Sequence, residues 1–124
     1  MTMTITKAST SEIRQALAQC TGTEHWYRHP LARACLYTDG ANLFAEMAGA
    51  YWFIDIVATD VLAFQSKEEF IVVTLAVADE KARITADDGN GRVFWSRDIE
   101  WTDCPEGAWK FFLQNNTLFV PSEY

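Results

Sequence analysis

Apolar residues near the start of the chain recur with the period of an amphipathic helix. Ser9 is followed three residues later by Glu12, which is the spacing of a capping box at a helix N-terminus. Apolar residues at helical spacing then follow, namely Ile13, Ala16, Leu17 and Cys20. The pattern predicts a first helix that begins after Ser9 and ends near Gly22.

A second and a third helix are predicted next. Thr38 or Asp39 can cap the second, and Gly49 would end or bend it. Its apolar face would be Leu43, Phe44, Met47 and Ala48. Residues 51–58 have apolar side chains around the whole helical wheel, which favours a central helix covered on several sides. Because these residues are rich in aromatic and β-branched types, a strand is the alternative. Between the first two helices, His29 precedes a proline and is expected to be extended, and residues 31–36 to form at most a short helical turn.

From Glu69 onwards the apolar residues recur with a period of two, as in a β-strand. Residues 70–77 are apolar on both faces, which is typical of a well-covered strand. Residues 82–86 alternate as a half-exposed strand, and residues 87–91 are expected to form a hairpin loop. The return strand would then share one apolar face, made of Val93, Trp95, Ile99 and Trp101.

The last hairpin is predicted to turn at Asn115 and Asn116. That register pairs two sets of apolar residues across the ladder, Leu113 with Leu118 and Phe112 with Phe119. Helices followed by strands indicate an α+β fold, with N-terminal helices packed on one face of a C-terminal antiparallel sheet of about four to five strands. With 124 residues, we expect one domain, residues 1–124.

Composition narrows the class of protein. Hydrophobic residues make up 49% of the chain and the net charge is −7, which argues against a disordered chain and against binding to nucleic-acid phosphates. We find no signal-peptide pattern and no apolar stretch of about 20 residues, so no membrane span is expected. Three cysteines without paired spacing, Cys20, Cys35 and Cys104, favour a reduced, cytoplasmic protein.

Asp55 is the first candidate functional residue, because it lies among apolar side chains of the third predicted helix. A buried carboxylate must be hydrogen-bonded or paired, or else its pKa rises. One hypothesis is a pocket for a ligand or substrate, with Tyr37, Asp39, Trp52 and Asp55 as its residues and His29 nearby. The structural alternative is that Asp55 caps a helix or pairs with Arg28, Arg33 or a tryptophan N–H.

Cys20, His25, His29 and Cys35 fall close together but lack the spacing of known zinc sites. Free cysteines also fit as small apolar residues on a helix face. No nucleophile and base stand in a recognised catalytic pattern. We therefore expect no metal, no cofactor and no catalytic set.

The acidic residues are distributed unevenly. Between Asp79 and Glu106 eight acidic residues stand against four basic ones. Such a surface can be merely solvated, or it can bind a basic protein partner, with an aromatic residue as an anchor. The candidate partner-binding residues are Asp79, Glu80, Asp87, Asp88, Phe94, Asp98 and Glu100.

Four short motifs carry a resemblance to a known family. They are residues 37–40 (Tyr-Thr-Asp-Gly), residues 48–55 (Ala-Gly-Ala-Tyr-Trp, then Asp55), residues 88–91 (Asp-Gly-Asn-Gly) and residues 121–124 (Pro-Ser-Glu-Tyr). Together with Thr102-Asp103 before Pro105, they resemble a family of small bacterial domains found on chromosomes, plasmids and prophages. The family has no assigned activity, so the resemblance implies no catalytic residues. It implies a whole-domain unit, in some cases from a mobile element.

The first hypothesis is therefore a small acidic, non-catalytic interaction protein. It would be a phage or plasmid accessory factor that binds and inhibits a host defence or nucleic-acid-binding protein, as an anti-CRISPR does. The alternative is a small-ligand-binding domain or enzyme with a pocket around Asp55. A third hypothesis is a homodimer formed through exposed aromatics such as Trp26, Tyr27 or Phe94.

Overall fold

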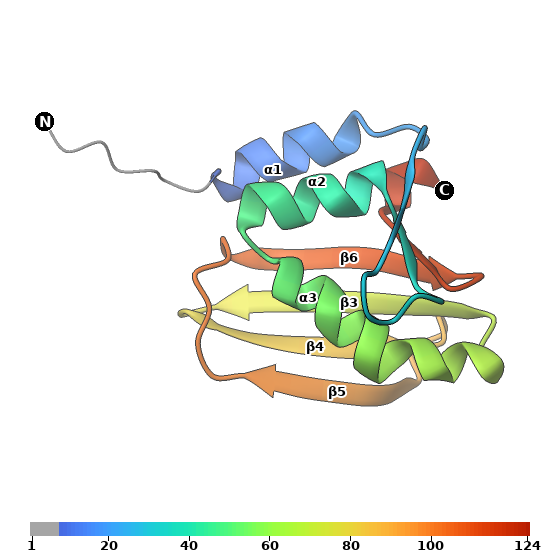
Figure 1. Cartoon of the computed structure of the whole chain (residues 1–124). Helices are drawn as coiled ribbons and strands as arrows, with labels where there is room; N and C mark the ends of the chain where they lie inside the picture. The colour runs from blue at the N-terminus through green and yellow to red at the C-terminus, as the bar shows by residue number, and fades with distance from the viewer. Residues whose placement is uncertain (1–7) are drawn as a thin grey trace, which may run out of the picture.

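The computed structural model describes residues 8–124, which form three helices and a seven-stranded sheet. The helices are α1 (Thr10–Ala18), α2 (Asp39–Ala48) and α3 (Tyr51–Ile56). Helix α3 continues through a π-helical turn at Val57–Val61 and a 3₁₀ turn at Leu62–Ser66, and a last 3₁₀ turn covers Pro121–Glu123. The strands are β1 (Trp26–Arg28), β2 (Leu36–Thr38), β3 (Phe70–Ala78), β4 (Lys81–Asp87), β5 (Val93–Ile99), β6 (Gly107–Gln114) and β7 (Thr117–Phe119). In Figure 1, α3 lies in front of β3 and β4, and α1 and α2 lie side by side above β6.

The strand order is β1-β2-β7-β6-β3-β4-β5. All neighbouring strands are antiparallel except β2 and β7, which are parallel. The predicted α+β class is confirmed, but four to five strands was too few. Strands β1 and β2 were missed because each has three residues, which is too short for a period of two to be recognised. They are held in the sheet because β1 pairs with β2 and β2 pairs with β7.

Helix α1 begins at its predicted cap. The Ser9 hydroxyl accepts the Glu12 N–H, and the Glu12 carboxylate accepts the Ser9 N–H at 3.1 Å. The helix ends at Ala18, earlier than the predicted end near Gly22. The N–H groups of the next two residues bond to carbonyls of its final turn, so the helix closes before the glycine is reached.

Helices α2 and α3 form where the sequence predicts them, but α3 is not covered on all sides, because Tyr51 is 44% exposed. The Thr38 hydroxyl accepts the Ala41 N–H, and Gly49 ends α2 with a φ of 63°, a left-handed conformation that favours glycine. The strand alternative for residues 51–58 is wrong, because this segment is helical throughout.

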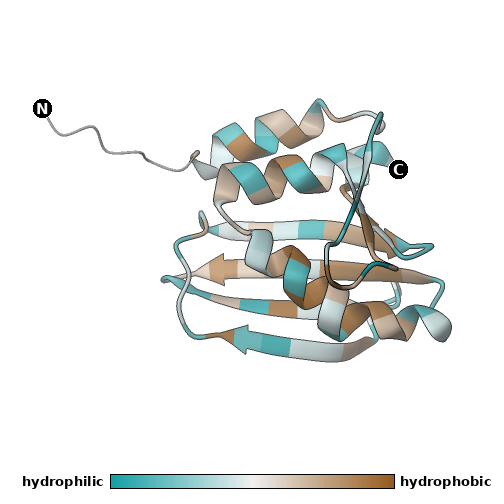
Figure 2. Cartoon of the chain, in the orientation of Figure 1, coloured by the Kyte–Doolittle hydropathy of each residue, from teal (hydrophilic) through white to brown (hydrophobic). Residues whose placement is uncertain are grey.

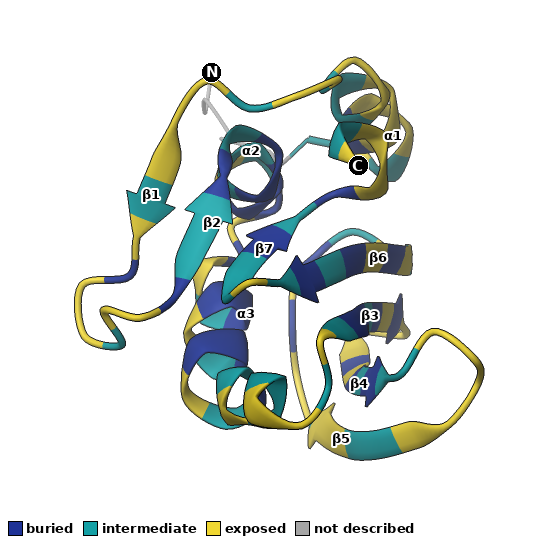
Figure 3. Ribbon diagram, turned by 90° about the vertical axis from the view of Figure 1, so that its right-hand side faces the viewer, coloured by how far each residue is buried: buried dark blue, intermediate teal, exposed yellow. Residues whose placement is uncertain are grey.

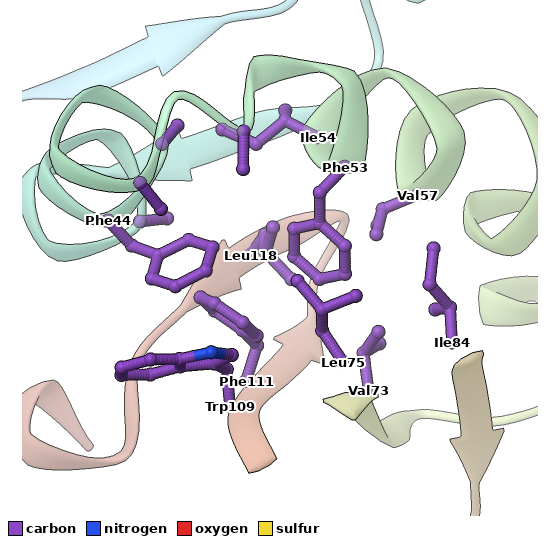
Figure 4. Close-up of a cluster of buried hydrophobic side chains, with 14 of the residues drawn as sticks. Phe44, Phe53, Ile54, Val57, Val73, Leu75, Ile84, Trp109, Phe111 and Leu118 are labelled. Atoms are coloured by element: carbon purple, nitrogen blue, oxygen red, sulfur yellow. The ribbon is translucent and has the colours of Figure 1, made fainter. Parts of the chain in front are cut away.

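The core fills the space between α2, α3 and the inner face of the sheet (Figure 4). Phe44 of α2 and Phe53 of α3 both pack on Phe111 of β6, with ring centroids 5.0 and 4.8 Å apart. Trp109 lies beside them, 5.3 Å from Phe44. All four side chains are at most 2% exposed, and burying each contributes about 1.5–3 kcal/mol relative to leaving it in water.

The predicted register of the last hairpin is confirmed. Leu113 pairs with Leu118 and Phe112 with Phe119. Both turn asparagines have positive φ, 53° for Asn115 and 59° for Asn116, as a tight hairpin turn requires. Alternation along the strands then sends Leu113 and Leu118 toward the helices and Phe112 and Phe119 away from them. Figure 2 shows bands of polar and hydrophobic residues along the strands.

Strand β5 departs from the predicted pattern. The ladder with β4 shifts between Ala86 and Asp87, so that Trp95 pairs with Ala86 but Val93 pairs with Asp87. This bulge breaks the single apolar face expected for the return strand. Val93 is 55% exposed, and Trp101, which lies beyond the strand, is 64% exposed.

Figure 3 views the sheet along its strands and shows that the two faces differ. Helix α3 packs on one side of β3 and β4, and no helix within residues 8–124 lies on the opposite side of these strands. We call that opposite side the outer face. In this same described range, no helix is long and apolar enough to cross a membrane.

Candidate functional site

Four aromatic side chains cluster on the outer face of the sheet. Phe112 of β6 is the centre, with ring centroids 4.9 Å from Phe70, 5.7 Å from Phe119 and 5.5 Å from Tyr124. The ladder places them together, because Phe112 lies directly opposite Phe119 on one neighbour and opposite Val72 on the other. We call Phe70, Phe112, Phe119 and Tyr124 the aromatic face.

A groove of about 420 Å³ continues from the aromatic face across the short strands β7, β2 and β1. Trp26 of β1 and Tyr124 are its most exposed aromatics, with exposed fractions of 58% and 77%. Phe119 and Tyr124 belong to both the groove and the aromatic face. We call this the aromatic groove; its lining residues are Thr23, Trp26, Thr38, Gln114, Asn115, Thr117, Phe119, Glu123 and Tyr124.

The predicted register pairs Phe112 with Phe119 but does not state which face of the sheet they occupy. The outward direction follows from Phe111, the neighbour that faces the helices, and a period of two would have shown it. Trp26 was named only as an exposed residue for a dimer. No sequence pattern joined it to the C-terminal turn, because β1 and that turn meet only through β2 and β7.

Glu123, at the floor of the groove, is held by three hydrogen bonds. Its carboxylate accepts the Thr38 hydroxyl at 2.7 Å and the N–H groups of Gly40 and Val120, each at 3.0 Å. The first and last motifs of the family pattern, residues 37–40 and 121–124, are therefore in direct contact. Ser122 of the last motif also donates to the carbonyl of Leu17 in α1, at 2.6 Å.

Asp39 has a structural role in the same junction. Its carboxylate accepts the N–H groups of Glu24 and His25 at 2.9 and 3.2 Å. These bonds, first among them the one from Glu24, lower the pKa of Asp39, and the Tyr27 hydroxyl acts in the same direction. Asp39 thus holds the segment that leads into β1.

Asp55 binds His29, which corrects the predicted burial of this carboxylate. Its side chain is 66% exposed, and Oδ1 lies 2.8 Å from Nε2 of the buried His29. On the other side of the ring, Nδ1 accepts the N–H groups of Leu31 and Ala32, at 3.2 and 2.9 Å. Nε2 must therefore carry the ring proton and donate it to Asp55. The pair joins the loop after β1 to α3 and occupies both ring nitrogens.

The other two residues predicted to share a pocket with Asp55 have packing contacts of their own. Tyr37 stacks on Tyr27 across the β1–β2 ladder, with centroids 5.4 Å apart and the rings inclined by 17°. Trp52 is half-buried and packs edge-on against Phe53 at 6.5 Å. These contacts, and the different partners of Asp39 and Asp55, place the four residues in separate structural roles.

Cys20, His25, His29 and Cys35 do not form a metal site. Within residues 8–124, the structure groups no three side chains of the His, Cys, Asp and Glu types that could hold an ion. Burial raises the pKa of the Cys35 thiol to about 11, so it behaves as a core residue. Cys20 is half-buried and packs against the core.

The seven residues predicted to bind a partner do not form one surface. Asp79 and Glu80 make the β3–β4 turn, whereas Asp87 and Asp88 lie at the other end of β4. These ends are about 20 Å apart, given a rise of about 3.3 Å per residue in a strand. The acidic residues predicted to form one face therefore lie at two opposite ends of β4.

Most of these carboxylates already have partners within the chain. Asp98 pairs with Arg83 at 2.7 Å, and Asp88 pairs with Arg92 at 3.3 Å. The carboxylate of Glu80 accepts the Trp101 indole N–H at 3.1 Å. Asp87 accepts the Gly89 N–H at 2.7 Å, and Glu100 is exposed just beyond β5.

Phe94, the aromatic residue predicted on the acidic surface, does not point outward beside the acidic side chains of β5. The bulge in β5 turns its ring toward the helical layer, where its centroid lies 4.9 Å from that of Phe64. The guanidinium of Arg92 lies over the ring, 5.8 Å from its centroid. Phe94 is thus a packing residue at the end of the core.

The fold and site define a two-layer α+β domain with helices on one face of its sheet and aromatic side chains on the other. The chain belongs to DUF6876, a family of unknown function, whose model matches residues 11–124. Comparison with curated proteins and with solved structures finds no match.

Proposed function

We propose that this chain is a non-catalytic protein-binding domain that docks a partner on the aromatic groove and the adjoining aromatic face. The supporting observation is that two aromatic side chains of the groove, Trp26 and Tyr124, are 58% and 77% exposed. The groove adjoins the outer face of β3 and β4, which no helix within residues 8–124 covers (Figure 3). Tryptophan and tyrosine are enriched among the residues that contribute most to protein interfaces. Displacing water from these rings is the driving force for docking.

The size and shape of the surface fit a protein better than a small molecule. The groove opens onto the aromatic face, since Phe119 and Tyr124 belong to both. A stable interface covers about 800 Å² on each partner, usually around a few central aromatic anchors. The groove and aromatic face would supply that centre.

A basic partner remains the favoured one. The chain has a net charge of −7, and the one charged residue that lines the groove is the acid Glu123. Carboxylates at the ends of the β4–β5 hairpin are engaged locally, but they still contribute to the long-range field that attracts a basic protein. We therefore propose the aromatic groove, and not the acidic β4–β5 hairpin, as the centre of the interface. The partner is still expected to be basic.

The finer hypothesis concerns what the partner is. The partner would be a host defence or nucleic-acid-binding protein, inhibited by a phage or plasmid accessory factor in an anti-CRISPR or other anti-defence role. This hypothesis is motivated by the resemblance and by the net charge of −7. A second copy of the chain is the competing occupant of the surface.

The alternative of a ligand pocket or enzyme site at Asp55 has less support. The His29–Asp55 pair uses both ring nitrogens in local hydrogen bonds, which leaves the imidazole without a nitrogen to exchange a proton with a substrate. Asp55→Asn separates the two hypotheses, because a structural pair predicts altered stability with unaltered binding to the partner.

Site-specific photocrosslinking tests the proposal. A benzophenone amino acid replaces Thr117, which lines the groove, in one variant and Trp101, which is exposed beyond the far end of β5, in the other. We expect a crosslinked protein at position 117 and none at position 101 in cells that carry the gene. Equal crosslinking at both positions, or none at position 117, contradicts the proposal. A product of twice the chain's mass identifies a second copy as the partner.

A further inference from the structure

We infer that the aromatic groove binds a basic side chain, an arginine or a lysine presented by the partner protein, in a cation–π box. The inference rests on the proposed function and adds the chemical group that the partner inserts. It comes from three features of the groove: its aromatic walls, its charge and the rigidity of its floor.

The walls of the box are three aromatic rings from separate parts of the chain. Trp26 comes from β1, Phe119 from β7 and Tyr124 from the C-terminal turn. Phe119 and Tyr124 are inclined to one another by 65°, with centroids 5.9 Å apart. Rings that meet at such an angle offer faces from more than one direction, and a cation within about 6 Å of a ring face is attracted by its quadrupole.

The charge of the lining selects a cation. Of the nine lining residues, one is a carboxylate, Glu123, and none is Lys, Arg or His. The hydroxyl and amide oxygens of the remaining polar residues can accept N–H groups from an ammonium or guanidinium. An anionic side chain would meet the Glu123 carboxylate without a compensating positive charge.

The floor of the box is already fixed before anything binds. Glu123 is held by hydrogen bonds from Thr38, Gly40 and Val120, so the carboxylate is oriented by the fold itself. A binding site that needs no reordering avoids part of the entropic cost of association.

The chain uses the same interaction elsewhere with its own arginines. Arg14 lies 4.8 Å over the Trp109 ring, and Arg92 lies 5.8 Å over Phe94. Within residues 8–124, no arginine or lysine of the chain lies over Trp26, Phe119 or Tyr124 in this way.

The neighbouring groove beside α1 makes a useful contrast. It has a volume of about 260 Å³ and is lined by Arg14 and Lys110 as well as by apolar side chains. Two cations in the lining would repel an incoming basic group. Selectivity for a basic side chain is thus a property of the aromatic groove.

NMR titration with short peptides tests the inference directly. The probes are acetylated and amidated Gly-Ser-X-Ser-Gly peptides in which X is arginine, lysine or norleucine, the last being uncharged and similar in length. The readout is the indole N–H resonance of Trp26, assigned by its loss in Trp26→Phe. We expect a saturable shift with the arginine and lysine peptides, and binding of the norleucine peptide weaker by about fivefold or more.

Two variants control the measurement. Trp26→Ala should abolish saturable binding of the arginine peptide, as read from other groove resonances, and Trp101→Ala should leave it unchanged. Norleucine binding as tightly as arginine, or no saturable shift with any peptide, overturns the cation–π box. If crosslinking at position 117 persists in that case, the proposed function stands without the box. If crosslinking at position 117 also fails, the proposed function and the box are both contradicted.

Discussion

The carboxylate of Glu123 accepts the backbone N–H of Gly40 at 3.0 Å, although the two residues are 83 positions apart in the chain. The same carboxylate accepts the hydroxyl of Thr38, the N-cap of α2. An acidic group at a helix N-terminus stabilises the unpaired N–H groups there. The C-terminal turn therefore caps α2, and the two family motifs are explained by one structural contact.

Gly40→Ala should destabilise the protein, even though alanine is the better helix former by about 1 kcal/mol. A Cβ at position 40 would lie 2.5 Å from Glu123 Oε1 and 2.7 Å from Val120 Cγ2, so the C-terminal turn would have to move. We expect a loss of about 1–3 kcal/mol in the free energy of unfolding, measured in urea.

Gly22→Ala is the matched control for that measurement, because a Cβ at position 22 would meet no atom within 4 Å. It should change the free energy of unfolding by less than about 0.5 kcal/mol. A Gly40→Ala protein as stable as the parent would show that the turn is not anchored at α2.

Local sequence signals predicted the parts of the fold that local physics determines. The Ser9–Glu12 capping box, the αL residue Gly49 and the Asn115–Asn116 turn each depend on a few consecutive residues, and all three were identified. The register of β6 and β7 followed from that turn, since a two-residue loop leaves one way to pair the strands.

The site could not be predicted in the same way, because it is assembled from distant segments. Trp26, Phe119 and Glu123 meet only after β2 inserts between β1 and β7 in parallel with β7, and no sequence period encodes that pairing. Phe94 was predicted on the acidic surface, but a bulge in β5 breaks the alternation and turns its ring toward the helical layer. Asp55 was expected to be buried, but its helix turns that side chain toward solvent and His29.

The ring of His29 should be fixed in one tautomer when neutral. Two backbone N–H groups point at Nδ1, so the proton belongs on Nε2, which donates to Asp55. We expect the ¹⁵N shifts of the imidazole to show a protonated Nε2 and an unprotonated Nδ1. Asp55→Ala should destabilise the fold by about 1 kcal/mol, and Asp55→Asn by less, since an amide oxygen still accepts. A protonated Nδ1 would contradict this hydrogen-bond arrangement.

Acid should weaken the protein partly through Asp39. Hydrogen bonds from Glu24, His25 and Tyr27 hold the pKa of Asp39 in the folded protein below its ordinary value of 3.8. A carboxyl whose pKa is lowered by folding adds stability above its unfolded pKa and loses it as the pH falls through its folded pKa. The contribution of Asp39 should therefore be present at pH 5 and decline below about pH 4.

Asp39→Asn keeps an acceptor oxygen but cannot titrate, so it isolates this effect. Its free energy of unfolding should fall less steeply than that of the parent between about pH 5 and pH 3. Identical slopes for the parent and Asp39→Asn would show that Asp39 does not contribute to the acid sensitivity.

Phe111 and Phe112 are neighbours in β6 that face opposite sides of the sheet. Replacing each by alanine should therefore lower the free energy of unfolding by very different amounts. Phe111 is 1% exposed and packs on Phe44 and Phe53, so Phe111→Ala should cost about 3–5 kcal/mol. Phe112 is half-buried in the aromatic face, so Phe112→Ala should cost less than half as much but weaken binding to the crosslinked partner. Urea unfolding and a pull-down with each variant measure the two effects. Equal losses of stability would mean that the outer face is covered in solution, which makes a second copy of the chain, detectable by light scattering, the occupant of this surface.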